Sequence, residues 1–507
     1  MSDFDQNSLD SLLNTAQAAA KKMQKLSSDQ VERIVKAVVA AAAEKSEYYA
    51  QWAVRETGYG RVDDKHMKNM GVISPFLGGT ADFGLYVRPR VDNENKIVEI
   101  PKPAGVITAL VPVTNPIATV YYKAVCALLT RNAIILSPHP GSKESSTDVL
   151  NYLHDVAVRN GAPTGCMQVV QKPAVALTQA LMQDERNNLT LATGGPDMVR
   201  AAYSSSNPAI GVGAANVACY VDRTADIVKA AKDIVFSAPF DNSLPCTCES
   251  VVVADMPIAA QFKQEMKNNS AYFVESAEER QKLRDFLYPE GKMNVKMIGK
   301  DAAVIAQQAG FSIPSSVRLL VMPISSIGYH EPFSKEKMFP VVGFFEVDGC
   351  EEAIQTALSM LNLMGKGHSA AIFANNPDVV IRFGAALPVC RIPVNTPACL
   401  GSSGTTTNIV NSPVIGTGFF GRSSVDSNVG PEQLVQWTRV AFGNEPAAAY
   451  SDMDSAVDKL IAEQNLNAVN NNASASSSSA EFSDPRNDLK ELIREVLAEE
   501  LRDILKK

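Results

Sequence analysis

The spacing of hydrophobic positions changes along the chain, and each change predicts a different kind of element. Over residues 8–82 apolar side chains recur every three or four positions, which is the period of one helix face. Ser28 or Asp29 is predicted to cap the second of these helices. Two short apolar runs rich in β-branched residues, 86–90 and 96–100, then predict a hairpin of two strands.

From residue 105 onward, continuous apolar runs alternate with helical patterns. Strands are predicted over 106–111, 133–136, 167–170 and 189–193, and the helices between them over 116–129 and 145–158. Strands that alternate with helices in this way are typical of a parallel, doubly wound sheet. Ligands bind such sheets beyond the carboxyl ends of the strands, so the loops after these strands are candidate binding loops.

A second alternating region follows residue 246. Helices are predicted over 259–268, 351–361 and 377–385, and strands over 318–322, 341–345 and 370–373, with 391–395 closing the region. A late strand is predicted over 434–441. A chain of 507 residues is too long for one small core. The pattern therefore predicts an α/β protein with two doubly wound domains.

Composition excludes several classes of protein. No apolar run reaches the length of a membrane span, and residues 1–6 lack the features of a signal peptide. The formal net charge of −8 argues against nucleic acid as a main partner. Eight cysteines without a framework spacing indicate free thiols in a reducing compartment. The sequence thus predicts a cytoplasmic protein that binds neither membrane nor nucleic acid.

The chemistry is expected around a cysteine that follows a polar turn and precedes an apolar strand. Pro245 restricts the backbone just before Cys246, and strand residues 251–254 follow at once. A thiolate presented at such a place is a candidate nucleophile. The alternative is that Cys246 and Cys248 are small core residues. No metal site is predicted, because a C-x-C pair without a second Cys/His cluster lacks the usual ligand spacing.

A second candidate feature is the pair of glycines that ends strand 189–193. Gly194 and Gly195 precede Pro196, which is well placed to open a helix. A helix N-terminus behind glycines suits a phosphate group. The G-x-G-x-x-G dinucleotide motif is absent, so the residues alone leave a phosphate site and a simple turn both open.

Taken together, these segments resemble the coenzyme-A-acylating branch of the aldehyde dehydrogenase superfamily. The segment 240–250 is similar to the nucleophile segment of that branch, and further similar motifs follow the order of the family over roughly residues 10–442. These motifs are 114–116, 137–140, 192–195, 210–213, 331–337, 367–369 and 395–398.

The resemblance implies an aldehyde dehydrogenase-like fold with a third, small element. Residues 1–84 and 101–240 would form the cofactor-binding domain, and residues 241–430 the catalytic domain. Residues 85–100 and 431–442 would supply oligomerisation strands, in which the early hairpin pairs with the late strand of another subunit. A homodimer or a homotetramer is implied.

The resemblance also implies the chemistry. Cys246 would attack a short aldehyde, and the Asn115 side chain and the Cys246 backbone N–H would stabilise the oxyanion. Glu336 would bind the nicotinamide ribose of NAD, with NADP left open, and Gly194 and Gly195 would border the pyrophosphate. The other implied cofactor-binding positions are Thr114, Ser137, Pro138, His139, Thr193, Gly211, Val212 and Gly213. The alternatives are that Asn115 is a turn residue before proline and Glu336 a solvated charge.

The absence of a glutamate at position 211 bears on how the acyl group would leave Cys246. Hydrolytic members of the family carry a glutamate that activates water, and Gly211 stands at the matching place. Coenzyme A needs less activation than water, so the resemblance implies coenzyme A as the acyl acceptor. A dehydrogenase that releases free acid and an inactive scaffold are the alternatives. Two positions depart from the family, namely Ala215 in place of a glycine and Cys248 in place of a small residue; Cys248 could compete as a nucleophile or pair with Cys246.

The composition changes again after residue 442. Residues 443–482 are predicted to be a flexible linker with a short helix over 451–464, and residues 483–507 an amphipathic helix. This helix would either fold back on the enzyme or pair with itself, or bind another protein. It resembles the encapsulation peptides of bacterial microcompartment enzymes. That resemblance implies shell proteins as partners and the microcompartment lumen as the location.

Overall fold

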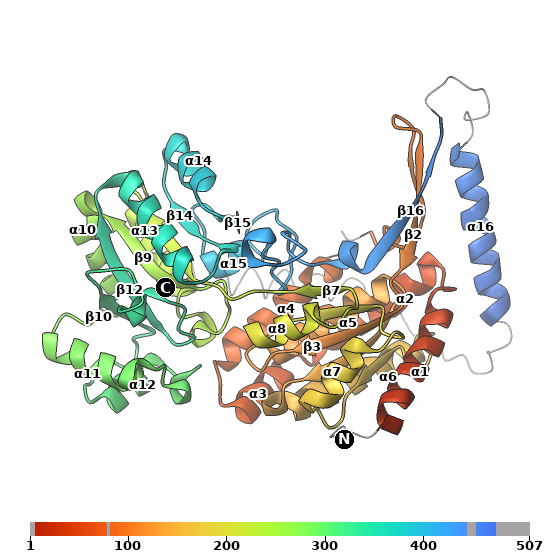
Figure 1. Ribbon diagram of the computed structural model, residues 1–507, viewed down its shortest axis with the longest axis horizontal. Helices are drawn as coiled ribbons and strands as arrows, with labels where there is room; N and C mark the ends of the chain where they lie inside the picture. Colours follow the sequence, from red (N-terminus) through yellow and green to blue (C-terminus); the bar gives the residue numbers. More distant parts are fainter. Residues whose placement is uncertain (1–5, 79–81, 444–452, 473–507) are drawn as a thin grey trace.

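The computed structural model describes residues 6–78, 82–443 and 453–472 of the chain. Figure 1 shows two α/β bodies side by side and a narrow arm of strands that projects beside one of them, flanked by a helix. One body contains a five-stranded sheet and the other a six-stranded sheet, and all paired strands within each are parallel. None of the described helices is both long enough and apolar enough to cross a bilayer.

The predicted helical region at the start of the chain is confirmed. It consists of α1 (Gln6–Met23), α2 (Ser28–Glu44), α3 (Ser46–Thr57) and α4 (Val62–Leu77). The cap of α2 is Ser27 rather than Ser28 or Asp29. The Ser27 hydroxyl accepts the Gln30 N–H, and the Gln30 side chain accepts the Ser27 N–H in return. This reciprocal pair places the cap one residue earlier than the prediction.

The five-stranded sheet has the order β5-β4-β3-β6-β7. Its strands are β3 (Val106–Val111), β4 (Ala133–Pro138), β5 (Met167–Val169), β6 (Leu189–Ala192) and β7 (Ala209–Gly211), and its connecting helices are α5 (Pro116–Leu129), α6 (Lys143–Arg159), α7 (Val175–Gln183) and α8 (Pro196–Tyr203). The predicted parallel doubly wound sheet is confirmed, and β7 and α7 are additions to it.

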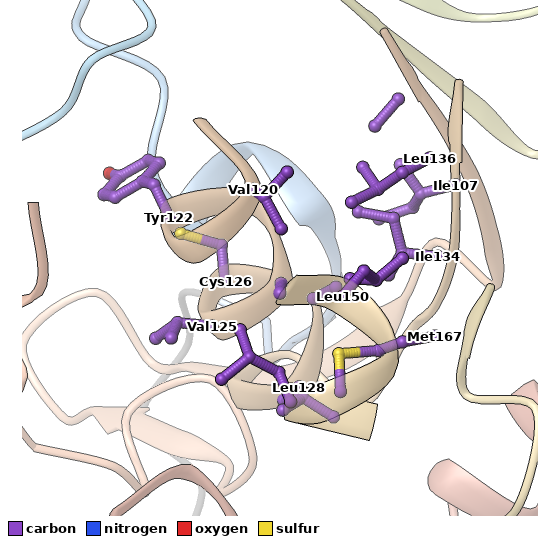
Figure 2. Close-up of a cluster of buried hydrophobic side chains, with 14 of the residues drawn as sticks. Ile107, Val120, Tyr122, Val125, Cys126, Leu128, Ile134, Leu136, Leu150 and Met167 are labelled. Atoms are coloured by element: carbon purple, nitrogen blue, oxygen red, sulfur yellow. The ribbon is translucent and has the colours of Figure 1, made fainter. Parts of the chain in front are cut away.

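Helix α5 is the centre of this body. All of its residues are buried, because it packs between the sheet and other helices. Figure 2 shows side chains of α5, among them Val120, Val125 and Leu128, in a buried apolar cluster that also contains Ile134 of β4 and Leu150 of α6. A helix held on every side is a rigid base for whatever its N-terminus presents, and Asn115 is the residue that precedes it.

The six-stranded sheet has the order β10-β11-β12-β9-β8-β14. Its strands are β8 (Val217–Val221), β9 (Glu249–Asp255), β10 (Ala271–Phe273), β11 (Leu319–Pro323), β12 (Val341–Val347) and β14 (Ala371–Phe373), beside a pair formed by β13 (Gly367–Ser369) and β15 (Val389–Arg391). The helices are α9 (Ile227–Ser237), α10 (Met256–Asn268), α11 (Ala277–Leu287), α12 (Ala302–Ala309), α13 (Gly349–Leu363), α14 (Pro377–Ala386) and α15 (Ala398–Ser402).

The change from one sheet to the other comes earlier than the predicted boundary at 240/241. Strand β8 pairs with β9 and β14, so the second sheet begins at Val217. A buried strand has the same apolar pattern in either sheet, and only its pairing shows to which sheet it belongs. The predicted boundary is therefore wrong by one strand and one helix.

The arm is a three-stranded sheet of β1 (Arg90–Asp92), β2 (Ile97–Pro103) and β16 (Val435–Ala441), in the order β1-β2-β16. The first strand begins at Arg90, because residues 83–87 form turns instead of the predicted strand. Strand β16 pairs with β2 of the same chain along its full length, so the predicted pairing with another subunit is wrong for these strands. Oligomerisation through the arm stays a prediction.

The predicted linker 443–482 contains a helix, α16 (Met453–Asn472), which is longer than the short helix expected over 451–464. Met453 and Val457 of α16 are buried against Val98 of β2, which explains why the segment is ordered as a helix beside the arm. Residues 473–482 of the predicted linker and the predicted helix 483–507 lie outside the described residues.

Candidate active site

The loop before Cys246 has an uncommon backbone. Asp241, Asn242 and Ser243 have φ values of 48°, 55° and 61°, in the left-handed region that non-glycine residues rarely adopt. Contacts from other segments stabilise this turn. The Asp241 N–H donates to the Asp64 carboxylate at 2.9 Å, and the Asp241 carboxylate accepts the Arg61 N–H at 2.8 Å. The loop therefore presents Cys246 in a fixed place at the amino end of β9.

The Cys246 thiol contacts a histidine. The distance from Cys246 Sγ to His368 Nε2 is 3.1 Å, and His368 Nδ1 lies 2.8 Å from the Ser369 hydroxyl. When Nδ1 carries the proton and donates it to Ser369, Nε2 is free to accept the thiol proton. The sequence motif 367–369 was part of the resemblance, but His368 was not predicted as a site residue. Only the fold brings it beside a cysteine 122 positions away.

The ionisation of the two groups is set mainly by burial. Burial raises the pKa of Cys246 to about 12, with the Glu336 carboxylate as the second cause, while Arg391, the Cys246 backbone N–H and Lys68 oppose the shift. Burial and then the charge of Arg391 lower the pKa of His368 to about 3. At neutral pH the pair is therefore a neutral thiol beside a neutral imidazole. In such a pair the imidazole nitrogen can accept the thiol proton.

Arg391 is a second residue that the sequence did not indicate. Its buried guanidinium donates to the backbone oxygens of His368 at 2.9 Å, Gly416 at 2.5 Å and Asp426 at 2.5 Å. These acceptors are uncharged, so the cation keeps its full charge beside the thiol. Arg391 both fixes the backbone of His368 and favours the thiolate form of Cys246.

Asn115 occupies the N-cap position of α5, after the end of β3. Its Oδ1 accepts a hydrogen bond from Lys68 Nζ at 2.5 Å, and its Nδ2 donates to Thr114 Oγ1 at 3.2 Å. Lys68 also pairs with the Asp241 carboxylate on the nucleophile loop. The predicted oxyanion donor and the predicted nucleophile are thus connected through one lysine, which the sequence did not indicate.

The remaining predicted cofactor positions lie at one edge of the five-stranded sheet. Thr114, Ser137, Pro138, His139, Thr193, Gly194, Gly195, Gly211, Val212 and Gly213 all stand at or just after the carboxyl ends of β3, β4, β6 and β7. Because neighbouring strands are parallel, these ends share one edge. The structure therefore brings together residues that are up to 99 positions apart in the sequence.

The glycine turn after β6 is open, as a phosphate site requires. Gly194 and Gly195 are exposed, Gly195 is the N-cap of α8, and no atom lies within 4 Å of where a Cβ at Gly195 would stand. Buried Lys123 donates to Thr193 Oγ1 at 2.9 Å and to the Leu110 and Leu191 oxygens, which ties β3 to β6 below the turn. Such a turn at a helix N-terminus fits a pyrophosphate.

Two of the predicted cofactor residues have partners of their own. The Ser137 hydroxyl is buried against the Thr178 hydroxyl at 2.9 Å. His139 Nδ1 accepts the Gly141 N–H at 3.0 Å, although the residue is exposed. Ser137 therefore supports the sheet edge, while His139 and Pro138 line it.

Gly211 has no room for the side chain of a general base. A Cβ at this position would lie 2.5 Å from Val199 Cγ1 and 2.8 Å from the Tyr203 ring. The Tyr203 hydroxyl accepts the Gly211 N–H at 2.9 Å, and Ser423 Oγ donates to the Gly211 oxygen at 2.8 Å. Packing of α8 against β7 thus excludes a glutamate here unless the helix moves.

Glu336 lies close enough to the nucleophile for its charge to act on it. Burial raises the pKa of Glu336 to about 7, and a hydrogen bond from the Ala215 N–H opposes the shift. Its carboxylate is one of the groups that raise the pKa of Cys246. Glu336 is therefore no solvated charge, and its oxygens are acceptors suited to ribose hydroxyls. Ala215, the departure from the family glycine, supplies the backbone N–H that holds it.

Cys248 packs in a separate apolar cluster. Its side chain is buried in a cluster with Phe240 and Cys399, and its Sγ lies 3.8 Å from the Phe240 oxygen. Burial and the neighbouring Cys399 thiol raise the pKa of Cys248 well above its ordinary value. The interpretation as a core residue is confirmed for Cys248, whereas Cys246 contacts the polar site.

Comparison with known proteins finds relatives that match most of the chain. The model of the aldehyde dehydrogenase family matches residues 1–282. The chain is 36% identical over 448 residues to an aldehyde-alcohol dehydrogenase of Clostridium acetobutylicum, covering 86% of this chain and 51% of that protein. The chain thus spans about half the length of that relative.

Two solved structures share the fold over nearly their whole length. An acetylating aldehyde dehydrogenase from Geobacillus thermoglucosidasius has a TM-score of 0.84 at 36% identity and covers 88% of this chain and 99% of its own. A propionaldehyde dehydrogenase from the fucose utilisation microcompartment of Clostridium phytofermentans has a TM-score of 0.78 at 26% identity and covers 88% of this chain and 100% of its own. The chain belongs to the aldehyde dehydrogenase family.

Proposed function

We propose that the protein is a coenzyme-A-acylating aldehyde dehydrogenase, which converts a short aldehyde, coenzyme A and NAD⁺ to acyl-CoA and NADH. The observation that carries the proposal is the Cys246–His368 pair, 3.1 Å apart, in a site where Gly211 leaves no room for a water-activating carboxylate. The acetylating relative from Geobacillus, similar over 99% of its length, supports the same reading.

The first half of the reaction uses the thiol. Cys246 Sγ attacks the aldehyde carbon while His368 Nε2 accepts the thiol proton, since that nitrogen already faces the sulfur. The carbonyl oxygen becomes an oxyanion, which the Asn115 amide and the Cys246 backbone N–H stabilise. A bound nicotinamide cofactor would supply the acceptor for the hydride that this adduct loses on becoming a thioester of Cys246.

The chain's own residues fit that cofactor. Glu336, which is half-buried and accepts a hydrogen bond from the Ala215 N–H, would accept hydrogen bonds from ribose hydroxyls. The open turn of Gly194 and Gly195 at the N-terminus of α8 would receive the pyrophosphate, and Lys123 holds the neighbouring Thr193 in place.

The second half needs a nucleophile that reacts without a dedicated base at position 211. The thiol of coenzyme A is such a nucleophile. Once His368 has released the first proton to solvent, it can take the proton of the coenzyme A thiol and return it to Cys246 as the acyl group leaves. The alternative that releases free acid lacks a carboxylate where hydrolytic members have one. The alternative of an inactive scaffold is disfavoured by the Cys246–His368 contact, because a scaffold has no need of it.

A panel of short aldehydes tests the proposal. Acetaldehyde, propionaldehyde and sulfoacetaldehyde are each incubated with NAD or NADP, with and without coenzyme A, while NADH or NADPH formation and the acyl product are followed. Sustained turnover is expected only with coenzyme A, with acyl-CoA as the product. Sustained release of free acid without coenzyme A would support the hydrolytic alternative, and no turnover with any aldehyde would support the scaffold.

We also propose that residues 483–507 direct the enzyme into a bacterial microcompartment by binding shell proteins. The support is an apolar stripe at helical spacing that includes Leu492, Leu497 and Leu501 on an otherwise charged segment. An isolated amphipathic helix gains stability from docking its apolar face in a partner's groove. The structural neighbour from the fucose utilisation microcompartment agrees with such a location.

Deletion of residues 481–507 is expected to leave turnover and oligomeric state nearly unchanged but to abolish co-purification with shell proteins. Leu497→Glu combined with Leu501→Glu should act like the deletion, because it places two charges on the docking face. Glu491→Gln and Arg494→Gln, on the charged face, are the matched controls. The measurement is retention of a fluorescent cargo fused to residues 481–507 within purified shells. Cargo that stays outside, or a deletion that dissociates the oligomer, would contradict the packaging proposal.

A further inference from the structure

Lys68 connects three parts of the molecule at the active site. It belongs to α4, its ammonium donates to Asn115 Oδ1 at the start of α5, and it pairs with Asp241 on the nucleophile loop. Its side chain is only 12% exposed. Asp241 itself is held by the Arg61 N–H and by a second lysine, Lys65, at 3.0 Å. Because Asp241 is itself held in place, its pairing with Lys68 keeps the ammonium in a fixed position next to Asn115.

The hydrogen-bonding capacity of Asn115 shows what Lys68 does. An ammonium can only donate, so the amide atom that faces Lys68 must be the oxygen. One of the two amide hydrogens is directed to Thr114 Oγ1 at 3.2 Å. The other N–H has no partner among the described residues and is therefore left for a substrate. Without Lys68 the amide could turn by half a circle and present its oxygen, which would repel an oxyanion instead of stabilising it.

The positive charge of Lys68, like its hydrogen bond to Asn115, favours binding of an oxyanion by the Asn115 amide. An ammonium on the carbonyl side of an amide draws electron density from the N–H groups and strengthens them as donors. Lys65 and Lys68 share the carboxylate of Asp241, and the positive charge of Lys68 is one of the causes that lower the pKa of the Cys246 thiol. That charge favours the negative charge that develops on sulfur and then on the substrate oxygen.

We propose that Lys68 is a positioning residue for the reaction: it fixes the Asn115 amide with one N–H toward the oxyanion and couples that donor to the nucleophile loop through Asp241. The inference rests on the proposed function, because it assumes that Asn115 binds the oxyanion. Lys68 positions the Asn115 side chain, and its charge also acts on the Cys246 thiol.

A double-mutant cycle with Lys68→Met and Asn115→Ala tests this role. Removing one oxyanion donor typically costs about 10²–10³ in kcat, so Asn115→Ala is expected to lose that much. Lys68→Met should lower kcat by roughly 10–100-fold with KM changed less than about threefold, since the loss arises in the transition state. In the Asn115→Ala background, Lys68→Met should cost a clearly smaller factor than in the native enzyme, because the group it positions is gone and only the loss of positive charge near Cys246 remains.

Lys65→Met is the matched control. Lys65 binds the same Asp241 carboxylate, but its other contact is the Thr114 backbone oxygen at 3.2 Å rather than the Asn115 side chain. Its effect should therefore be the same in the native and the Asn115→Ala backgrounds. Lys68→Arg, which keeps the charge and the donors, should recover activity to within about tenfold of the native enzyme. Lys68→Gln, which keeps a neutral donor, replaces Lys68→Met if the latter unfolds.

The outcomes separate this inference from the proposed function. If Asn115→Ala loses little activity, the oxyanion role of Asn115 is wrong and the proposed mechanism fails with it. If Asn115→Ala loses activity but Lys68→Met costs the same factor in both backgrounds, the positioning role alone is overturned. The rate of Cys246 alkylation by iodoacetamide, which needs no turnover, gives a second readout. It should fall in Lys68→Met at fixed pH because the thiolate loses a favourable charge, and an unchanged rate would contradict the electrostatic part of the inference.

Discussion

Cys246→Ala is expected to abolish NADH formation with every aldehyde. The covalent path requires a sulfur beside His368, and loss of a catalytic nucleophile lowers kcat by up to about 10⁶ in comparable enzymes. The measurement is initial NADH formation with saturating aldehyde, NAD and coenzyme A, together with thermal unfolding to show that the variant folds. Because the thiol is half-buried and Cys→Ala removes one atom, the melting temperature should change little.

Cys248→Ala is the matched control for that experiment. Cys248 differs from Cys246 by two positions but is buried beside Phe240 and Cys399, away from His368. Most of the activity should therefore remain, with a small loss of stability from the cavity. Normal turnover in Cys246→Ala, or complete inactivity of a folded Cys248→Ala, would contradict the assignment of the nucleophile.

His368→Ala is expected to lower kcat by about 10²–10⁴ at pH 7, the usual contribution of a general base. The direction in which the rate of this variant changes with pH follows from the ionisation of His368 and Cys246. His368 stays neutral at working pH because burial lowers its pKa to about 3, and Cys246 stays a thiol because burial raises its pKa to about 12. Without the imidazole, only solvent can deprotonate the thiol, so the variant's rate should rise about tenfold per pH unit from pH 7 to 9.

Comparison of pH–rate profiles checks this prediction. The native enzyme should rise less steeply than His368→Ala over the same range, so the deficit of the variant should shrink as pH rises. Ser369→Ala removes only the partner of Nδ1 and should cost less than about tenfold, because the Arg391 bond to the His368 backbone remains. A His368→Ala profile parallel to that of the native enzyme would show that the imidazole is not the base.

Much of the fold was predictable because its signals are local. The fully buried strand over 106–111 is an unbroken apolar run, and helix α5 has Pro116 at its first position and an unbroken apolar sequence after it. Cys246 and Asn115 were predictable for a related reason: each stands beside a proline at the end of an element, in a motif similar to those of the family.

The contacts within the candidate site were not predictable from local patterns. His368, Arg391 and Lys68 have ordinary sequence surroundings, and only sheet pairing and helix packing bring them near Cys246 and Asn115. The pairing of β16 with β2 of the same chain and the membership of β8 in the second sheet are also tertiary facts. The apolar pattern of a strand does not indicate which other strand it pairs with.

Trapping the acyl enzyme tests the central claim most directly. The enzyme is mixed with excess NAD and aldehyde in the absence of coenzyme A, NADH is followed by stopped flow, and the quenched protein is analysed by intact mass and peptide mapping. About one NADH per active site should form in a burst, with one acyl group on Cys246 that is released as acyl-CoA when coenzyme A is added. Continued NADH formation with release of free acid, or an acyl group on a residue other than Cys246, would contradict the account.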